Sequence, residues 1–529
     1  MHRMRMLGQI INAACIFSAL LTLSMFGVLC YRTFSERHVD LYIKVFNARV
    51  HQYFCGKDSM FEGRRVAYFV SDTERFLQWT HHKLFIFTFY SFLAGLVLFV
   101  VILLVWSKQG STAHRKQIIA GNTIAPEKAI INSMLRKKQA SSIKLMNLPL
   151  VKDTETQHIL FTGTTGSGKT NAMQHICHQI RDQKAVIVDT NGSFLDKYYD
   201  PRRDIVLNPF DPRFPGWDIW GECTKSYHYD EIAANLIPET KQDPFWTQSS
   251  RILLSNILKH LYGEQNCSVS KIMEYANSLS LQKLHEKLAH TGAASLIDPK
   301  SEKTALSIRT SLASHIACLG HLMDQPSAHA FSIRNWVQDP SQNGWLFIHA
   351  LPPQRESLRP LLSCFVSVAM KSLMECNPDK DRRLWFMIDE LPSLHKLSDL
   401  PLCLAEGRKY GACMALGVQN IPQLEELYGH SITKSLIDLC STKVFFRCAS
   451  FAIAQQLSGL VGMQEYREML ESLSYGVHDT RDGVSLHTQT RETPVIPPYE
   501  LMNLPNYSSF VQLPQGYPIA KIKWDLAPK

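Results

Sequence analysis

The sequence predicts an α/β fold with a parallel sheet, an inserted all-helical domain and an N-terminal pair of membrane-spanning helices. Three observations lead to this. Two long apolar stretches without charged side chains lie near the N-terminus, short apolar runs alternate with helical patterns in two later regions, and about 100 residues of helical periodicity separate those regions. A chain of 529 residues is too long for one compact core, so we expect several domains.

The two apolar stretches are residues 7–30 and 84–106. At 1.5 Å per residue each helix would reach roughly 35 Å, enough to cross a hydrocarbon layer of about 30 Å. A cleaved signal peptide is the alternative interpretation of the first stretch, with Arg3 and Arg5 as its charged leader. The stretch lacks a small-residue cleavage site and a second span lies nearby, so we expect a retained hairpin over residues 1–106.

The distribution of charge predicts the orientation of this hairpin. Residues 107–144 hold eight Lys or Arg and one acid, whereas the loop 32–83 holds nine basic and six acidic residues. Because basic segments stay in the cytoplasm, we expect an extracytoplasmic loop 32–83 and a cytoplasmic juxtamembrane linker over 107–145. The net charge of +9 is too diffuse to indicate DNA binding by itself. Only Cys55 lies in the outer loop, so we expect no disulfide framework there.

Apolar runs that alternate with helices predict the strands of a parallel sheet covered on both faces. The expected strands are 158–162, 185–189, 204–207, 345–349, 384–389, 413–418 and 444–447. Residues 225–325 show helical periodicity and few strand-like runs, which predicts an inserted helical domain. The sheet domain then has a first part at 146–224 and a second part at 326–529, with the segment after residue 494 docked on it.

An eight-residue motif lies between the expected strand 158–162 and a helix over 171–181. Its residues match G-x-x-x-x-G-K-[ST] in full: Gly163, Thr164, Thr165, Gly166, Ser167, Gly168, Lys169 and Thr170. Glycines let successive backbone N–H groups turn toward phosphates, and the helix N-terminus adds positive potential. Lys169 supplies a charge for the β and γ phosphates, and the Thr170 hydroxyl is a ligand for Mg²⁺. The motif predicts binding and hydrolysis of ATP with Mg²⁺.

A nucleotide hydrolase of this kind also needs a carboxylate at the end of a neighbouring strand. The run 384–388 is followed by Asp389 and Glu390. We expect Asp389 on the metal side and Glu390 next to the attacking water, which it orients or deprotonates. Asp189 also follows an expected strand, and the sequence leaves open whether it approaches the metal or caps the turn Asp-Thr-Asn-Gly.

Several further segments, together with the hairpin and the phosphate loop, resemble the type IV secretion coupling proteins, most closely the F-type conjugative TraD coupling protein family. They are 208–220 (NPFDPRFPGWDIW), 243–246 (DPFW), 302–309 (EKTALSIR), 343–347 (NGWLF), 389–397 (DELPSLHKL), 406–411 (EGRKYG), 417–420 (GVQN) and 481–485 (RDGVS). Together these segments extend through nearly the whole chain.

The resemblance implies a hexameric, RecA-like ATPase of the bacterial inner membrane, multi-pass, with its ATPase domain in the cytoplasm. Proteins of this family accept a relaxase–DNA complex from the relaxosome and feed single-stranded DNA to a type IV secretion channel. The resemblance further implies that Arg408 acts across the subunit interface and that Gln419 senses the γ-phosphate. No local pattern of basic and aromatic residues marks a DNA groove, so no DNA-contact residue is predicted.

Two other functions remain open from the sequence. One is a chromosome-segregation-type translocase for double-stranded DNA, which usually has four spans, a long linker and a winged-helix module. The other is a membrane receptor that docks protein substrates to a secretion channel. F-type relatives carry a long C-terminal extension that binds a relaxosome partner, whereas this sequence ends at Lys529. We therefore expect the helical insertion to contact substrate.

Overall fold

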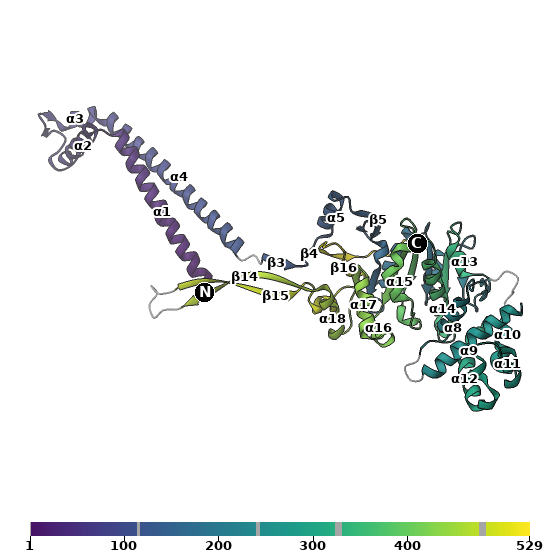
Figure 1. The fold of residues 1–529 in the computed structure, drawn as a ribbon. Helices are drawn as coiled ribbons and strands as arrows, with labels where there is room; N and C mark the ends of the chain where they lie inside the picture. Colours follow the sequence, from purple (N-terminus) through teal and green to yellow (C-terminus); the bar gives the residue numbers. More distant parts are fainter. Residues whose placement is uncertain (1, 114–116, 240–243, 323–330, 475–482, 529) are drawn as a thin grey trace. The chain divides into compact units, whose positions relative to one another are not determined.

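The computed structural model describes residues 2–113, 117–239, 244–322, 331–474 and 483–528 (Figure 1). It divides into two compact units, one formed by Met1–Gln117 with Tyr466–Arg491 and the other by Ile118–Glu465 with Glu492–Lys529. Asp243 of the DPFW segment, Arg481 and Asp482 of the RDGVS segment, and the expected domain boundary at residue 325 lie outside the described residues.

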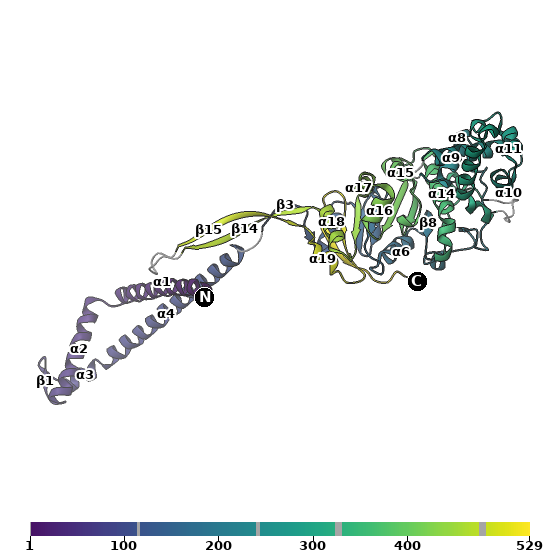
Figure 2. The same cartoon turned by 90° about the horizontal axis from the view of Figure 1, so that it is seen from below.

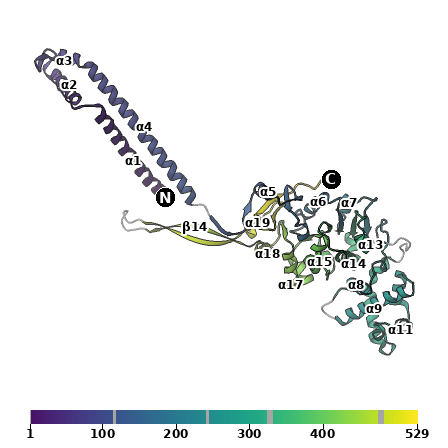
Figure 3. The same cartoon turned by 45° about the horizontal axis from the view of Figure 1, so that its top comes forward.

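The first unit contains the expected helix pair, α1 (His2–Thr33) and α4 (Glu74–Ala113), which lie side by side (Figure 3). In the described part of the chain, two segments are long and apolar enough to cross a membrane, Ile11–Thr33 and Glu74–Trp106. The helices approach closely at Gly95, where a Cβ atom would lie 2.2 Å from the Thr22 hydroxyl oxygen.

The region between these helices is itself mostly helical. It contains α2 (Glu36–Cys55), β1 (Met60–Phe61), β2 (Arg64–Arg65) and α3 (Val66–Asp72). The strands β1 and β2 pair as a short antiparallel hairpin.

The second unit is built on a ten-stranded sheet of order β4-β17-β16-β13-β7-β12-β11-β8-β10-β9. The strands from β13 to β9 in this order are all parallel, whereas β16 runs antiparallel to β13 and to β17. Their bounds are β4 (Ile124–Ala125), β7 (Ile159–Thr162), β8 (Lys184–Asp189), β9 (Ile205–Leu207), β10 (Trp345–His349), β11 (Leu384–Ile388), β12 (Ala412–Val418), β13 (Thr442–Phe445), β16 (Ser508–Gln512) and β17 (Ile519–Lys523). Every expected strand is present, which confirms the predicted parallel sheet.

The sheet is buried on both faces because helices pack against each of them, and the alternating side chains of a strand enter the two apolar clusters in turn. Trp345 and Phe347 of β10 pack in one apolar cluster with residues of α5 (Glu127–Arg136) and α6 (Lys169–Gln179). Leu346 and Ile348 of the same strand pack in the other cluster with α14 (Arg355–Met374). The other helices around the sheet are α7 (Leu195–Tyr198), α13 (Ile333–Gln338), α15 (Leu400–Glu406), α16 (Ile421–Tyr428), α17 (His430–Leu439), α18 (Phe451–Val461) and α19 (Pro498–Met502).

A group of helices follows β9, in the region where the sequence predicts an insertion (Figures 1 and 2). It contains α8 (Ser226–Leu236), α9 (Pro244–Gly263), α10 (Val269–Met273), α11 (Leu281–Leu288) and α12 (Glu302–His315). α9 lies in contact with α8 and α12, and its buried residues include Leu253, Leu254 and Ile257. The group has no strand among its described residues, in agreement with the predicted all-helical domain.

Two segments differ from the sequence-based description. Residues 107–145, expected to be a linker, contain the end of α4, β3 (Gln117–Gly121), β4, α5 and the whole of β5 (Ala140–Leu145), which pairs with β6 (Leu148–Val151). The amphipathic face of α5 explains this, because Ile130 and Met134 are buried. The strands β14 (Met463–Ser474) and β15 (Gly483–Pro494) join β3 in a three-stranded sheet, where the sequence predicts only a continuation of the second part.

Candidate functional site

The phosphate loop connects β7 to α6, and its backbone conformation requires glycine. Gly163, Gly166 and Gly168 have φ values of +152°, +74° and +116°, which side chains rarely allow. At Gly163 a Cβ atom would also lie 2.5 Å from the Cβ of Phe446. The glycines of the motif therefore fix a tight curl in front of the N-terminus of α6, the geometry that directs backbone N–H groups toward an anion.

Lys169 and Thr170 of the motif are the first two residues of helix α6. The Lys169 Nζ donates hydrogen bonds to the carbonyl oxygens of Gly163 at 2.5 Å and Thr164 at 3.2 Å. Burial lowers the pKa of Lys169, and the nearby carboxyl groups of Glu390 and Asp389 oppose this shift. The ammonium is thus held inside the curl of the loop, next to the carboxylates.

Asp389 lies directly after β11 and faces the first turn of α6. The Thr170 hydroxyl donates to its two carboxylate oxygens, at 2.9 and 3.1 Å. Burial raises the pKa of Asp389, and the Thr170 hydrogen bond opposes the rise. A hydroxyl and a carboxylate held together in this way supply hard oxygen donors, so these two residues fit a Mg²⁺ ion.

Glu390 and Gln419 lie together because of the strand order. Strand β12 lies between β7 and β11, so Gln419, just after β12, lies between the phosphate loop and the carboxylates. Its side-chain oxygen accepts a hydrogen bond from the Thr165 hydroxyl at 3.2 Å, and its side chain also hydrogen-bonds to Glu390. Burial raises the pKa of Glu390 to about 7, although the charge of Lys169 opposes the rise.

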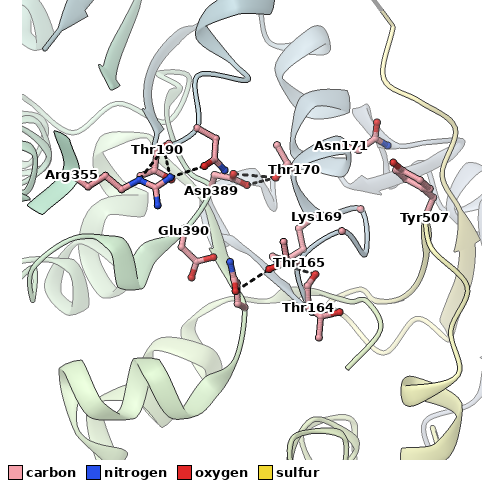
Figure 4. A pocket seen from close by; sticks show the side chains of 14 residues that line it. Thr164, Thr165, Lys169, Thr170, Asn171, Thr190, Arg355, Asp389, Glu390 and Tyr507 are labelled. Atoms are coloured by element: carbon pink, nitrogen blue, oxygen red, sulfur yellow. Dashed lines mark hydrogen bonds between the residues drawn. The ribbon is translucent and has the colours of Figure 1, made fainter. Parts of the chain in front are cut away.

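Nine of the predicted site residues line one cavity of about 330 Å³, whereas Gly163 and Ser167 do not (Figure 4). The nine are Thr164, Thr165, Gly166, Gly168, Lys169, Thr170, Asp389, Glu390 and Gln419. Sequence reasoning missed five other residues of its lining, which are Asn171, Thr190, Asn191, Arg355 and Tyr507. Arg355 donates from Nε to the Thr190 carbonyl at 3.0 Å and from a terminal nitrogen to Asn191 Oδ1 at 2.6 Å. An arginine soon after the strand 345–349 was visible in the sequence, but no motif marks it as a cavity residue.

Asp189 has the turn-capping role that the sequence left open. Its carboxylate is fully buried and accepts four backbone N–H hydrogen bonds of 2.8–3.1 Å, from Asn191, Gly192, Phe194 and Leu195. Because the carboxylate is enclosed by the turn that follows β8, it is not a metal-side residue.

Arg408 is not brought to the cavity of its own chain. Its side chain is exposed on the 3₁₀ turn Gly407–Tyr410 and does not line the site. Among the residues that the structure describes, its guanidinium has no hydrogen-bond or ion-pair partner. An exposed, unpaired guanidinium is compatible with a role at another subunit.

A comparison with protein families identifies this arrangement. The model described as "Type IV secretion-system coupling protein DNA-binding domain" matches residues 142–525. The chain belongs to this family. It is 35% identical over 444 residues to the coupling protein TraD of Escherichia coli K12, a match that covers 82% of this chain and 62% of TraD. The chain thus spans about three-fifths of the length of that relative.

Solved structures of the conjugative coupling protein TrwB share the fold. TrwBdeltaN70 in its unbound form has a TM-score of 0.69 and 26% identity, covering 79% of this chain and 95% of TrwBdeltaN70. This likeness confirms the predicted RecA-like P-loop fold with its all-helical domain. TrwB has also been solved with ADP and Mg²⁺, and with non-hydrolysable analogues of ATP and GTP.

Proposed function

We propose that this chain is an ATP-driven coupling protein that recruits a relaxase–DNA complex and drives DNA transfer through a type IV secretion channel. One observation carries the proposal: three separate segments of the chain bring their side chains to one cavity, namely Lys169, Thr170, Asp389, Glu390 and Gln419. The same chain has two potential membrane spans. Membership of the coupling-protein family supports the choice of DNA as substrate.

In the proposed mechanism a nucleoside triphosphate lies along the phosphate loop. Backbone N–H groups of residues 163–170 and the start of α6 hold the phosphates, and Lys169 exchanges its loop carbonyl partners for β and γ oxygens. Thr170 and Asp389 would hold Mg²⁺, which would neutralise negative charge of the phosphates.

Glu390 is the residue positioned to orient or deprotonate the attacking water. A pKa near 7 suits a general base because the group is part ionised at neutral pH and still accepts a proton readily. Gln419 contacts both Thr165 of the loop and Glu390, so its position depends on what the loop holds. These contacts support Gln419 as the γ-phosphate sensor of the proposed mechanism.

The exposed Arg408 completes the proposal as a residue that acts in trans. In a ring of identical subunits, such a cation reaches the γ-phosphate of the neighbouring site and stabilises the charge of its transition state. A homo-hexamer is the assembly that we propose. The hairpin would hold the ring at the cytoplasmic face of the inner membrane as a multi-pass protein, with the residue 32–83 region outside.

The proposal is tested by the ATPase activity of the full chain in micelles, with single-stranded DNA, double-stranded DNA and no DNA. We expect single-stranded DNA to stimulate turnover, and Lys169→Ala to abolish it without changing membrane insertion. Lys434→Ala, which removes an exposed lysine of α17, is the matched control. DNA-stimulated activity that persists in Lys169→Ala would contradict the site, and co-purification of protein cargo without nucleic acid would favour a receptor for protein substrates.

Mixing experiments test the action of Arg408 across the interface. Arg408→Ala alone should lose turnover, because its own site lacks the neighbour's cation. Mixed rings of Arg408→Ala and Lys169→Ala should recover part of it, since an intact site then meets an intact arginine. Lys409→Ala, the adjacent exposed cation, should behave like the unchanged chain. Mixtures that stay inactive would refute an in-trans role.

A further inference from the structure

Tyr507 is fixed at the edge of the nucleotide cavity by the backbone on both of its sides. Its N–H donates to the carbonyl of Ser167 in the phosphate loop at 2.9 Å, and its own carbonyl accepts from the N–H of Trp524 at 2.7 Å. These bonds hold the tyrosine at φ +57°, a conformation that is uncommon for residues other than glycine and is concentrated at ligand sites.

Trp524, which follows β17, anchors this arrangement. Its indole Nε1 donates to the Ser509 hydroxyl at 2.8 Å and its ring lies 6.0 Å from that of Phe446. The ring of Tyr507 also lies against Gly168, where a Cβ atom would be 3.2 Å from Tyr507 Cδ1. The position of the tyrosine is therefore set by the loop and by the end of the sheet together.

The Tyr507 side chain itself is open to the cavity. It is 38% exposed and lines the same cavity as the phosphate loop. In the part of the chain that the structure describes, its hydroxyl has no hydrogen-bond partner. A tyrosine whose backbone is fixed, whose side chain is accessible and whose hydroxyl makes no hydrogen bond is suited to stack against a flat ligand.

The order of residues along the site determines which part of the ligand would reach this ring. Asp389 and Glu390, the residues at the γ-phosphate end, lie on one side of the loop, and Tyr507 and Asn171 lie on the other (Figure 4). A triphosphate with its terminal phosphate next to Glu390 directs its nucleoside toward Tyr507.

Asn171 is not free to read the base. Its Nδ2 donates to the Asp525 carbonyl at 2.8 Å, and its Oδ1 accepts from the Ala527 N–H at 2.8 Å. Both ends of its amide are thus used to hold the C-terminal segment on α6, and His175 donates to the same Asp525 carbonyl at 2.9 Å.

We propose that Tyr507 is the platform on which the nucleobase of the bound nucleotide stacks, and that the site holds the base without reading its edge. Adenine and guanine then bind with similar affinity, since either purine offers a flat face. Tyr507 acts on affinity rather than on the chemical step. This inference rests on the proposed nucleotide site and adds the subsite for the base.

The test compares ligands with and without a base by calorimetry on the full chain in micelles. The ligands are ADP, GDP, ribose 5-diphosphate and tripolyphosphate, all with Mg²⁺. We expect Tyr507→Ala to weaken ADP and GDP by a similar factor, on the order of 5- to 150-fold, because that is the range for base–aromatic stacking. Ribose 5-diphosphate and tripolyphosphate should bind unchanged, and Tyr507→Phe should retain full affinity for all four ligands.

A control variant and the base-free ligand tripolyphosphate separate stacking from a structural role of Tyr507. Tyr499→Ala removes a tyrosine that is 60% exposed and does not line the cavity, so it should change no affinity. Equal weakening of ADP and tripolyphosphate in Tyr507→Ala would overturn the platform, because the tyrosine would then act only through the loop. Clearly different affinities of the unchanged protein for ADP and GDP would contradict the inference that the site makes no base-specific contact.

The unchanged protein gives an independent measurement if Tyr507→Ala does not fold. ADP and GDP should both bind it more tightly than ribose 5-diphosphate, whereas equal affinities would overturn the platform. If the unchanged protein bound neither ADP nor tripolyphosphate, the proposed function itself would fail. The two failures are therefore distinguishable.

Discussion

Gly417 offers a sharp test of the strand arrangement that positions the catalytic residues. It lies in β12, and a Cβ atom there would be 1.9 Å from the carbonyl oxygen of Asp389. A carbon and a carbonyl oxygen normally approach to about 3.3 Å, so Gly417→Ala must displace one backbone relative to the other by about 1.4 Å. Crowding of this kind costs about 1–3 kcal/mol of stability.

The displacement affects catalysis more than folding, because Gln419 follows Gly417 by two residues and Asp389 is the contacted residue. A misplacement of about 1 Å can lower the rate about 100-fold, so kcat for ATP should fall by that order. The phosphate loop is not part of this contact, so the affinity for ADP should change little. Steady-state ATPase assays and calorimetry on the full chain measure both quantities.

Gly459→Ala is the matched control for this prediction. Gly459 lies within α18, and a Cβ atom there has no neighbour within 4 Å. Alanine in a helix should stabilise by about 0.5–1 kcal/mol relative to glycine. If Gly417→Ala turned over ATP at the rate of Gly459→Ala, the close approach of β12 and β11 would not position the site as argued.

Three other perturbations are predicted from single contacts. Burial lowers the pKa of His158 from 6.5 to about 4. The free energy of unfolding should therefore be unaffected by this group above pH 6.5 and should decrease by about 3 kcal/mol as the pH falls toward 4, as measured by thermal unfolding. Gly95→Leu should separate α1 from α4 at Thr22 and lower the stability of the micelle-bound chain by about 1–3 kcal/mol. Arg355→Ala should lower kcat/KM for ATP about 10- to 100-fold, because the charged hydrogen bond that holds Asn191 at the cavity is lost.

Each of these changes has its own control. His158→Gln cannot titrate, so its stability should vary less between pH 6.5 and 4, and an equal decrease would refute the assignment. Gly27→Leu places the same side chain on α1 where no atom lies within 4 Å, and equal effects at both glycines would contradict close packing at Gly95. Arg355→Lys keeps the charge without the planar fork and should recover only part of the activity.

The strands of the sheet could be predicted because they are buried on both faces. A strand with one solvent-exposed face alternates polar and apolar residues, whereas β10 begins Trp-Leu-Phe-Ile and all four residues are buried. The same reasoning explains the missed elements at residues 107–145. There β3 and β4 are short, and the apolar face of α5 rests on few residues, so local patterns do not separate them from a polar linker.

The cavity residues that sequence reasoning missed belong to no local motif. Arg355 follows β10 and Tyr507 precedes β16, and these strands lie on opposite sides of β7 in the sheet order. Each residue reaches the nucleotide cavity only because of the order in which distant strands pair. A motif such as residues 163–170 is recognisable because its chemistry is complete within eight residues, whereas these positions depend on tertiary structure.

Asp189 and Asp389 show where local patterns stop being informative. Asp189 is the last residue of β8 and Asp389 directly follows β11, and these buried strands are direct neighbours in the same parallel sheet. The chain after Asp189 turns back so that four N–H groups surround its carboxylate. Asp389 instead faces the hydroxyl of Thr170 on another element, and its oxygens remain at the cavity. A strand-end carboxylate is therefore available to a metal ion only where the following turn leaves its oxygens without backbone donors.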